Sequence, residues 1–318
     1  MSMNKVIVTA RSFGKSSDEA ERLLREHGCD VVRITAGSES VEQQVRREIV
    51  DADAVVAGLE EYGADVIASA RNLKVISRYG VGYDKVDVDA AKAHGVAVTF
   101  TPGANGDSVA DLAVTLMLSA ARNICYMDRT LQRPSGLEMY QKTLGVIGVG
   151  RIGKGVARRC RGFDMDVLLY DAFYQDEEFA DAVGGKFVDL ETLIRESDFI
   201  SIHANLNDST RNMFSTEQFQ AMKGTAVLVN TARGGIVDED ALYEALRDGE
   251  IYAAALDAVA DEADEANNRL RELNNCILTP HAGAATREAS AKMSLMAAQN
   301  VIDVLESGTC TNLVPPLR

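Results

Sequence analysis

The feature that most constrains this chain is a glycine-rich turn between a strand-like and a helix-like segment. Residues 143–153 read TLGVIGVGRIG and contain the spacing G-x-G-x-x-G. The apolar start indicates a buried strand, and a helix is expected to begin after the turn. There Gly148 permits a tight turn, Gly150 lets a pyrophosphate approach the backbone, and Gly153 allows close packing of the helix. The sequence therefore predicts a dinucleotide site at this turn.

An acidic residue ends the next strand-like run. Asp171 lies 18 residues after Gly153, where a carboxylate accepts hydrogen bonds from the adenosine ribose hydroxyls. The same carboxylate repels the 2′-phosphate of NADP, and residues 172–178 contain no Arg or Lys to attract that phosphate. We therefore expect NAD as the cofactor. The expected contacts in this region are Gly148, Gly150, Arg151, Ile152, Gly153 and Asp171.

Short apolar runs rich in β-branched residues alternate with amphipathic segments along the chain, which predicts parallel α/β sheets. The runs of the first part are 6–9, 31–34, 54–56, 75–77 and 96–100. Those of the second part are 144–149, 167–170, 199–203, 226–230, 253–256 and 276–278. The first helix is expected to begin at a capping box formed by Ser16 and Glu19 and to end at Gly28.

A Pro-, Gly-, Asn- and Asp-rich segment at 101–108 separates the two series, and a crossover helix follows it to about residue 123. A chain of 318 residues exceeds the usual size of one core. We predict two Rossmann-like or flavodoxin-like doubly wound parallel-sheet domains with an active-site cleft between them. The last helix, about 287–305, is expected to return to the first domain. The predicted domains are 102–286 for NAD and 1–101 with 287–318 for substrate.

Charge and cysteine content restrict the partners. The formal net charge is 33 − 48 = −15, which repels nucleic acid and anionic membranes, so neither is expected as a partner. The five cysteines are far apart and form no ligand cluster with histidine, so we expect reduced thiols and no metal site. We predict a cytoplasmic protein, because no signal-peptide pattern and no apolar run of roughly 18 residues is present.

Three residues beyond the later strand-like runs supply what hydride transfer to a keto acid requires, namely a cation, a proton donor and a partner for that donor. Arg233 follows the run 226–230, and its planar guanidinium suits a carboxylate. His281 follows the last run on the same expected sheet edge, and Glu262 precedes it. Taken singly, Arg233 is typical of a surface ion pair, Glu262 of an acidic stretch and His281 of a packed histidine.

The combination resembles a known family. From about residue 50 to 310 the chain is similar to the D-isomer-specific 2-hydroxyacid dehydrogenases, which include phosphoglycerate, glycerate, glyoxylate, D-lactate and formate enzymes. Glu262 lies 29 positions after Arg233, where this family carries its catalytic glutamate. The motifs that carry the resemblance are 77–84 (SRYGVGYD), 148–153 (GVGRIG), 231–238 (TARGGIVD), 255–257 (ALD) and 280–284 (PHAGA).

The resemblance implies a role for each of these residues. Arg233 would hold the substrate, His281 would act as general acid in reduction and general base in oxidation, and Glu262 would be its carboxylate partner. Backbone amides around Val81 and Gly82 would receive the substrate carboxylate. The implied cofactor contacts beyond the glycine turn are Ala204, Thr231, Ala232, Asp257 at the nicotinamide carboxamide, His281 and Gly283.

The sequence departs from the family pattern beside the glutamate. Residues 262–264 read EAD where the family usually has EEP, and Asn205 replaces a usual proline. The loop around Glu262 is therefore expected to differ in construction. Asp261 and Asp264 are alternative partners for the histidine.

The motif around Arg78 is most similar to short phosphoglycerate dehydrogenases that lack a regulatory domain. Arg78 would then bind the phosphate or second acid group of 3-phosphoglycerate, assisted by Arg129 or Arg133. In the alternative interpretation Arg78 only braces its loop. Residues 59–61 (LEE) stand where a second phosphate-binding arginine is often found. Because the sequence ends at Arg318, no serine feedback is expected.

Two other functions remain open at this point. One is a reductase for glycerate, glyoxylate or hydroxypyruvate. The other is a non-catalytic, NAD-sensing corepressor-like binding protein, against which the intact Arg233, Glu262 and His281 argue. Family members are generally dimers whose crossover helix packs against the partner, so the helix at 107–123 predicts a homodimer.

Overall fold

The computed structural model describes residues 3–35, 37–262 and 264–317. It divides the chain into two compact units, unit 1 with Met1–Asn105 and Ala284–Arg318, and unit 2 with Gly106–Gly283. Each unit contains one sheet, and every strand pair in both sheets is parallel. This confirms the predicted α/β class with parallel sheets.

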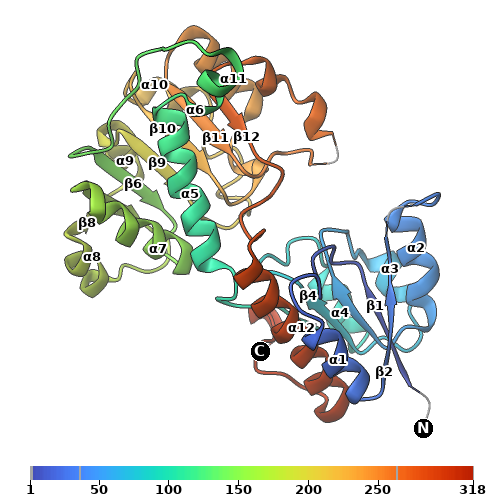
Figure 1. The fold of residues 1–318 in the computed structure, drawn as a ribbon. Helices are drawn as coiled ribbons and strands as arrows, with labels where there is room; N and C mark the ends of the chain where they lie inside the picture. The colour runs from blue at the N-terminus through green and yellow to red at the C-terminus, as the bar shows by residue number, and fades with distance from the viewer. Residues whose placement is uncertain (1–2, 36, 263, 318) are drawn as a thin grey trace. The chain divides into compact units, whose positions relative to one another are not determined.

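Unit 1 is built on a five-stranded sheet in the order β2-β1-β3-β4-β5 (Figure 1). Its strands are β1 (Asn4–Val8), β2 (Cys29–Arg33), β3 (Ala54–Ala57), β4 (Val75–Arg78) and β5 (Ala97–Thr99). Its helices are α1 (Glu19–Glu26), α2 (Val41–Glu48), α3 (Ala64–Ser69), α4 (Val88–Ala93) and α12 (Arg287–Ser307). All five predicted strand-like runs of the first part are strands in the structure.

Helices cover both faces of the unit 1 sheet. On one face, α1 and α12 pack on β1, β3 and β4. On the other, apolar side chains of α2, α3 and α4 pack on the opposite side chains of the same strands. Figure 1 shows α12, drawn near the red end of the colour range, beside the blue α1. The last helix of the chain therefore returns to the first unit, as predicted.

Unit 2 is built on a seven-stranded sheet in the order β12-β11-β10-β9-β6-β7-β8. Its strands are β6 (Thr143–Ile147), β7 (Asp166–Tyr170), β8 (Gly185–Phe187), β9 (Phe199–Ile202), β10 (Val227–Asn230), β11 (Ala253–Leu256) and β12 (Cys276–Leu278). Its helices are α5 (Gly106–Ala121), α6 (Ile124–Thr130), α7 (Arg151–Cys160), α8 (Glu177–Val183), α9 (Leu190–Glu196), α10 (Thr216–Ala221) and α11 (Glu239–Asp248).

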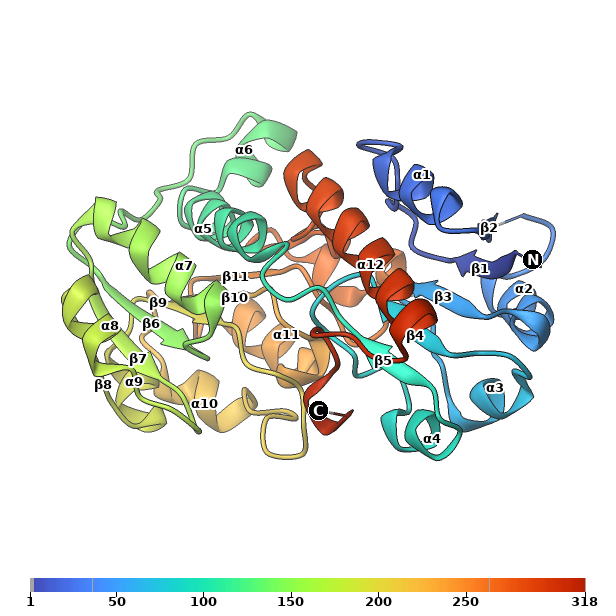
Figure 2. The same ribbon diagram turned by 90° about the horizontal axis from the view of Figure 1, so that it is seen from below.

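Two apolar layers enclose the unit 2 sheet. Successive strand residues point to opposite faces, so Val146 packs with α5, α7 and α8, while Ile147 packs with α9, α10 and α11. Figure 2 shows α5 and α7 side by side on one of these faces. Because both faces are covered, the strands consist of continuous apolar runs, which is why the sequence located them.

Two predictions about individual elements are wrong. The sequence analysis placed six strands in the second series, and the structure adds β8, a three-residue edge strand, GKF, without an apolar run. The helix α1 does not begin at a capping box of Ser16 and Glu19, because Asp18 is the N-cap and its side chain makes no capping bond. The Ser17 hydroxyl accepts from the Glu19 N–H instead.

In the described part of the chain, no single helix has the length and apolarity needed to cross a membrane. Helices α5 and α6 pass that test only when joined, and the chain bends by 57° between them.

Candidate active site

Arg233, Glu262 and His281 lie on the three loops that follow β10, β11 and β12. These strands are neighbours and parallel, so their carboxyl ends lie at one edge of the unit 2 sheet. Ligands bind at this edge in open α/β sheets. The fold therefore brings three residues that are far apart in the sequence to one edge.

His281 and Glu262 form a direct pair. Nδ1 of His281 lies 2.6 Å from Oε1 of Glu262, and both side chains are partly buried, with 29% and 23% of their surface exposed. The Asp261 carboxylate accepts from the Asp264 N–H, and the Asp264 carboxylate accepts from the Asn267 amide. Of the three acidic residues considered, the structure thus pairs Glu262 with the histidine.

The turn that carries His281 has an unusual backbone. His281 has a φ of 47°, a left-handed conformation that costs a non-glycine residue about 1–2 kcal/mol. The buried carboxylate of Asp257 holds this turn. It accepts from Thr279 Oγ1 at 2.6 Å, from the Ala282 N–H at 2.7 Å and from the Gly283 N–H at 2.8 Å. Asp257 therefore organises the histidine turn, a contact that the sequence did not indicate.

The loop that carries Arg233 is held by Asn230, the last residue of β10. The amide of this fully buried residue donates to the carbonyl of Arg233 at 2.7 Å and accepts from the Ala232 N–H at 3.0 Å. The guanidinium of Arg233 donates to the Ala232 carbonyl at 2.8 Å. Sequence reasoning missed Asn230 as a functional residue, although a buried amide at the end of a strand was a usable signal.

The arginine loop and the glutamate loop touch each other through Gly234. A Cβ at this position would lie 2.0 Å from the carbonyl carbon of Val259 and 2.2 Å from the nitrogen of Ala260. Only glycine permits this approach. The position of the Glu262 loop therefore depends on the absence of a side chain next to Arg233.

The glycine turn has the geometry that a bound pyrophosphate requires. Gly148 has a φ of 85°, and a Cβ there would lie 2.7 Å from the nitrogen of Ala204. A Cβ on Gly153 would lie 2.1 Å from the carbonyl oxygen of Gly148, whereas one on Gly150 would meet nothing within 4 Å. Gly150 is the N-cap of α7, and the first hydrogen bond within the helix runs from the N–H of Lys154 to the carbonyl of Gly150. The N–H groups of Arg151, Ile152 and Gly153 therefore have no partner within the helix. These residues fit a dinucleotide.

Asp171 lies directly after β7 and joins the glycine turn to the next loop. Its Oδ2 accepts from the Val149 N–H at 2.9 Å, and its Oδ1 accepts from the N–H groups of Phe173 and Tyr174 at 3.0 and 3.3 Å. A carboxylate has about four lone-pair sites, so capacity remains for a hydroxyl. Asp171 thus lies beside the turn, as the dinucleotide prediction requires.

His203 follows β9 at the same sheet edge. Its Nε2 lies 2.8 Å from the Ser201 hydroxyl, and its Nδ1 lies 3.4 Å from the hydroxyl of Thr231. Although part of the residue stays accessible, burial of the ring lowers the pKa of His203 to about 3. A neutral imidazole therefore packs between two strand ends, beside Ala204 and Thr231 of the predicted cofactor contacts. Sequence reasoning missed this residue because a single histidine in an apolar run carries little signal.

Arg78 lies in unit 1 and is 4% exposed. Its guanidinium donates to the carbonyls of Ala57 and Gly58 and, through Nε at 2.8 Å, to the carbonyl of Gly82. These bonds join the turn after β3 to the turn after β4, as the bracing interpretation expects. Val81 and Gly82, whose amides were predicted to receive a carboxylate, are partly exposed.

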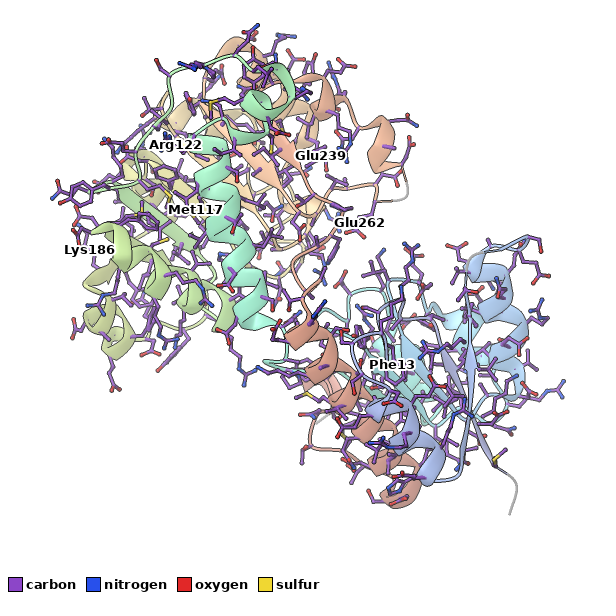
Figure 3. All side chains as sticks on the ribbon, in the orientation of Figure 1. Phe13, Met117, Arg122, Lys186, Glu239 and Glu262 are labelled. Atoms are coloured by element: carbon purple, nitrogen blue, oxygen red, sulfur yellow. The ribbon has the colours of Figure 1, made fainter. Side chains whose placement is uncertain are left out.

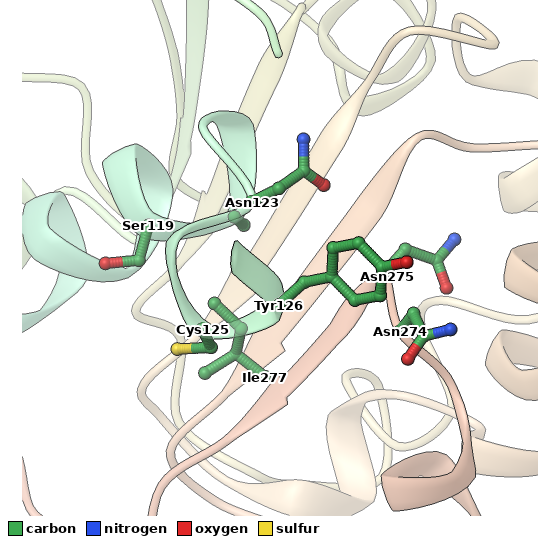
Figure 4. Close-up of a pocket in the computed structure, with 8 residues that line it drawn as sticks. Ser119, Asn123, Cys125, Tyr126, Asn274, Asn275 and Ile277 are labelled. Atoms are coloured by element: carbon green, nitrogen blue, oxygen red, sulfur yellow. The ribbon is translucent and has the colours of Figure 1, made fainter. Parts of the chain in front are cut away.

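Unit 2 also has a small hollow that is lined by other residues (Figure 4). Tyr126 of α6 and the amides of Asn274 and Asn275 line it, and Arg129 donates to Asn274 nearby at 2.8 Å. Both asparagines precede β12, so the hollow lies at the amino-terminal edge of the sheet, opposite the loops of the site. Among the described residues, no group of three His, Cys, Asp or Glu residues could hold a metal ion.

Comparisons with known proteins agree with this arrangement. Residues 114–283 match the family described as D-isomer specific 2-hydroxyacid dehydrogenase, NAD binding domain. A D-3-phosphoglycerate dehydrogenase from Archaeoglobus fulgidus is 39% identical over 306 residues, which are 94% of this chain and 57% of that protein. A glyoxylate reductase from Korarchaeum cryptofilum is 40% identical over 278 residues, which are 84% and 83% of the two chains.

One solved structure extends the likeness to the whole chain. The glyoxylate reductase from Paecilomyes thermophila superposes with a TM-score of 0.86 at 28% identity and covers 100% of both chains. By contrast, the chain spans little more than half the length of the Archaeoglobus relative.

Proposed function

The chain belongs to the D-isomer-specific 2-hydroxyacid dehydrogenase family, with NAD as its cofactor, and on that premise we propose that it interconverts a D-2-hydroxy acid and its 2-keto acid. The observation that carries the proposal is the 2.6 Å pair of His281 and Glu262 at the sheet edge that also holds Arg233 and the glycine turn. When bound, the nicotinamide accepts a hydride from the hydroxy acid or donates one to the keto acid.

The residues of unit 2 supply the remaining chemistry. Arg233 binds the substrate carboxylate and polarises the carbonyl, because a guanidinium offers two parallel donors. Nδ1 of His281 faces Glu262, so Nε2 is the atom that gives a proton to the keto oxygen and takes it back in oxidation. Glu262 fixes the orientation of the ring through its contact with Nδ1.

The cofactor contacts are assigned to residues at the same sheet edge. The backbone at Gly148, Gly150, Arg151, Ile152 and Gly153 would hold the pyrophosphate, and Asp171 would accept from the adenosine ribose. The contacts assigned nearer the nicotinamide are Ala204, Thr231, Ala232, Asp257, His281 and Gly283. Asp257 would act mainly by holding the histidine turn, because its oxygens already accept three hydrogen bonds.

Two substrates are supported by different observations. For 3-phosphoglycerate, the support is the motif around Arg78 and the name of the Archaeoglobus relative. For glycerate, glyoxylate or hydroxypyruvate, the support is the burial of Arg78 on three backbone carbonyls, which leaves fewer of its donors for a phosphate. In both cases the amides of Val81 and Gly82 would receive the carboxylate.

Several properties of the whole protein follow from the family as proposals. Residues 102–286 would be the NAD-binding domain, and 1–101 with 287–318 the substrate domain. The division into compact units at Asn105 and Gly283 supports these boundaries. We also propose a cytoplasmic homodimer that associates through the helix at 107–123, and no nucleic acid or membrane partner.

A panel of 2-keto acids at fixed NADH tests the function, with NADH oxidation as the readout. Turnover of phosphohydroxypyruvate alone would assign a phosphate role to Arg78, and turnover of glyoxylate and hydroxypyruvate would assign it a bracing role. NADH binding without any turnover would instead support the corepressor-like alternative. His281→Ala should abolish turnover while NADH binding stays unchanged.

A further inference from the structure

One carboxylate, that of Glu239, holds both ends of the loop that carries Glu262. Glu239 is the first residue of α11, and its Oε1 accepts from the N–H of Ala260 at 2.5 Å. Its Oε2 accepts from Nδ2 of Asn268 at 2.6 Å. The start and the end of the segment 260–268 are therefore fastened to one side chain, and Glu262 is the third residue of that segment.

The two ends of this segment connect to rigid elements. Ala260 follows the backbone against which Gly234 packs, next to the arginine loop. Asn268 accepts from the Leu270 N–H at 2.9 Å and caps the short 3-10 helix Arg269–Glu272. A loop whose two ends are fixed has fewer conformations available to it. Holding Glu262 in one position therefore costs less conformational entropy. Figure 3 labels Glu239 and Glu262 on the same unit.

The other charged groups around Glu239 do not replace this role. Within the segment, the carboxylates of Asp261 and Asp264 accept from groups of the segment itself, and that of Glu262 faces His281. On the side of β12, burial and, to a smaller extent, the negative charge of Glu239 raise the pKa of the Cys276 thiol to about 12. The Cys276 thiol is therefore neutral near neutral pH. The charge of Arg271 acts in the opposite direction and lowers its pKa, but by less. The carboxylate of Glu239 thus acts on the loop as a hydrogen-bond acceptor.

We propose that Glu239 is a positioning residue that holds Glu262 against His281. The proposal rests on the proposed function, in which this pair delivers the proton. The segment 262–264 reads EAD and lacks the proline that is usual in the family, so no rigid ring restricts the loop there. The carboxylate of Glu239 then holds the loop in place. Loss of the acceptor separates Glu262 from His281, and the ring then loses the partner that orients it.

Two variants remove the two bonds in different ways. Glu239→Ala removes both acceptors. Asn268→Asp keeps the oxygen that accepts from the Leu270 N–H, so the cap remains. It replaces the nitrogen that donates to Glu239 by an oxygen, so the two carboxylates repel each other. The matched control is Asp240→Ala, which removes an equal charge from the same helical turn at a carboxylate that faces Arg269 instead. Thermal unfolding of all variants checks that the fold is retained.

The first readout does not depend on turnover. It is the NMR signal of the Nδ1 proton of His281 in the NAD complex, which the hydrogen bond to Glu262 moves downfield. We expect this signal to move upfield in Glu239→Ala and Asn268→Asp, and to stay unchanged in Asp240→Ala. Glu262→Gln sets the maximum change. An unchanged signal in both loop variants overturns the proposal, whether or not any keto acid is reduced.

The second readout is a double-mutant cycle on kcat/KM for the best keto acid. A displacement of about 1 Å costs on the order of 100-fold, so Glu239→Ala should lower kcat/KM by about 10- to 100-fold in the parent enzyme. In the Glu262→Gln background it should have an effect below about twofold, because the residue through which it acts is absent. Multiplicative losses overturn the proposal. Absence of all turnover counts against the proposed function alone.

Discussion

Substitution of Gly234 by alanine tests whether the arginine and glutamate loops must touch. Ordinary van der Waals contact with a Cβ begins at 3.4 Å, and the added methyl would lie 2.0 Å from the Val259 carbonyl carbon. The difference, 3.4 − 2.0 = 1.4 Å, is the shift that one loop must make. The obstacle is backbone on both sides, so no side-chain rotation relieves it.

This shift should affect activity more than stability. Overpacking costs about 1–3 kcal/mol of unfolding free energy, which a two-unit protein tolerates. A displacement of more than 1 Å at Glu262 and Arg233 should lower kcat by on the order of 100-fold. The affinity for NADH should change little, because the glycine turn lies on other loops. Urea unfolding, keto-acid kinetics and NADH fluorescence titration measure these three quantities.

The adjacent glycine provides the matched control. A Cβ on Gly235 would lie 3.4 Å from a terminal carbon of Leu206, at ordinary contact distance from a flexible side chain. Gly235→Ala should therefore keep kcat within about threefold of the parent. Equal losses in both variants, or none at Gly234→Ala, would refute the reasoning from loop contact.

Three further predictions concern other parts of the site. Asp257→Asn replaces one acceptor by a donor at the histidine turn, so kcat for keto-acid reduction should fall by about 100-fold while NADH still binds. Stopped-flow kinetics measures this loss, and a parent-like kcat would contradict the account. Asp171→Ser should raise kcat/KM with NADPH relative to NADH, and an unchanged ratio means that Asp171 does not read the ribose. Between pH 6.5 and 3, the unfolded chain binds a proton at His203 that the folded chain excludes. The free energy of unfolding therefore falls as pH decreases, by at most about 1.4 kcal/mol per pH unit. His203→Gln should flatten that slope in urea unfolding followed over pH, and an unchanged slope contradicts the burial argument.

The sequence was informative wherever local pattern determines structure. Continuous apolar runs identified the buried strands because both sheet faces are covered. The glycine turn could be recognised because it lies between a strand-like and a helix-like segment, which are β6 and α7 in the structure. The edge strand β8 was missed because Gly185–Phe187 has little apolar content to bury. The start of α1 was misplaced because Asp18 competes with Ser16 as a first residue, and local propensity does not separate them.

The supports of the site were not predictable, because they depend on contacts between distant segments. Glu239 reaches Ala260 across 21 positions, and Asp257 reaches Gly283 across 26. The left-handed backbone at His281 likewise has no local signal, because the stabilising carboxylate comes from another strand. Resemblance to a family indicated which groups take part, and only the fold shows how they are held.

The value of kcat/KM for keto-acid reduction, measured with the parent enzyme, Glu262→Gln and His281→Ala, tests the central claim most directly. His281 gives the proton, and Glu262 lies 2.6 Å from its Nδ1 and orients the ring. Both substitutions should therefore lower kcat/KM by on the order of 100-fold or more, while the affinity for NADH stays unchanged. Parent-like kcat/KM in Glu262→Gln would contradict the claim that this pair delivers the proton.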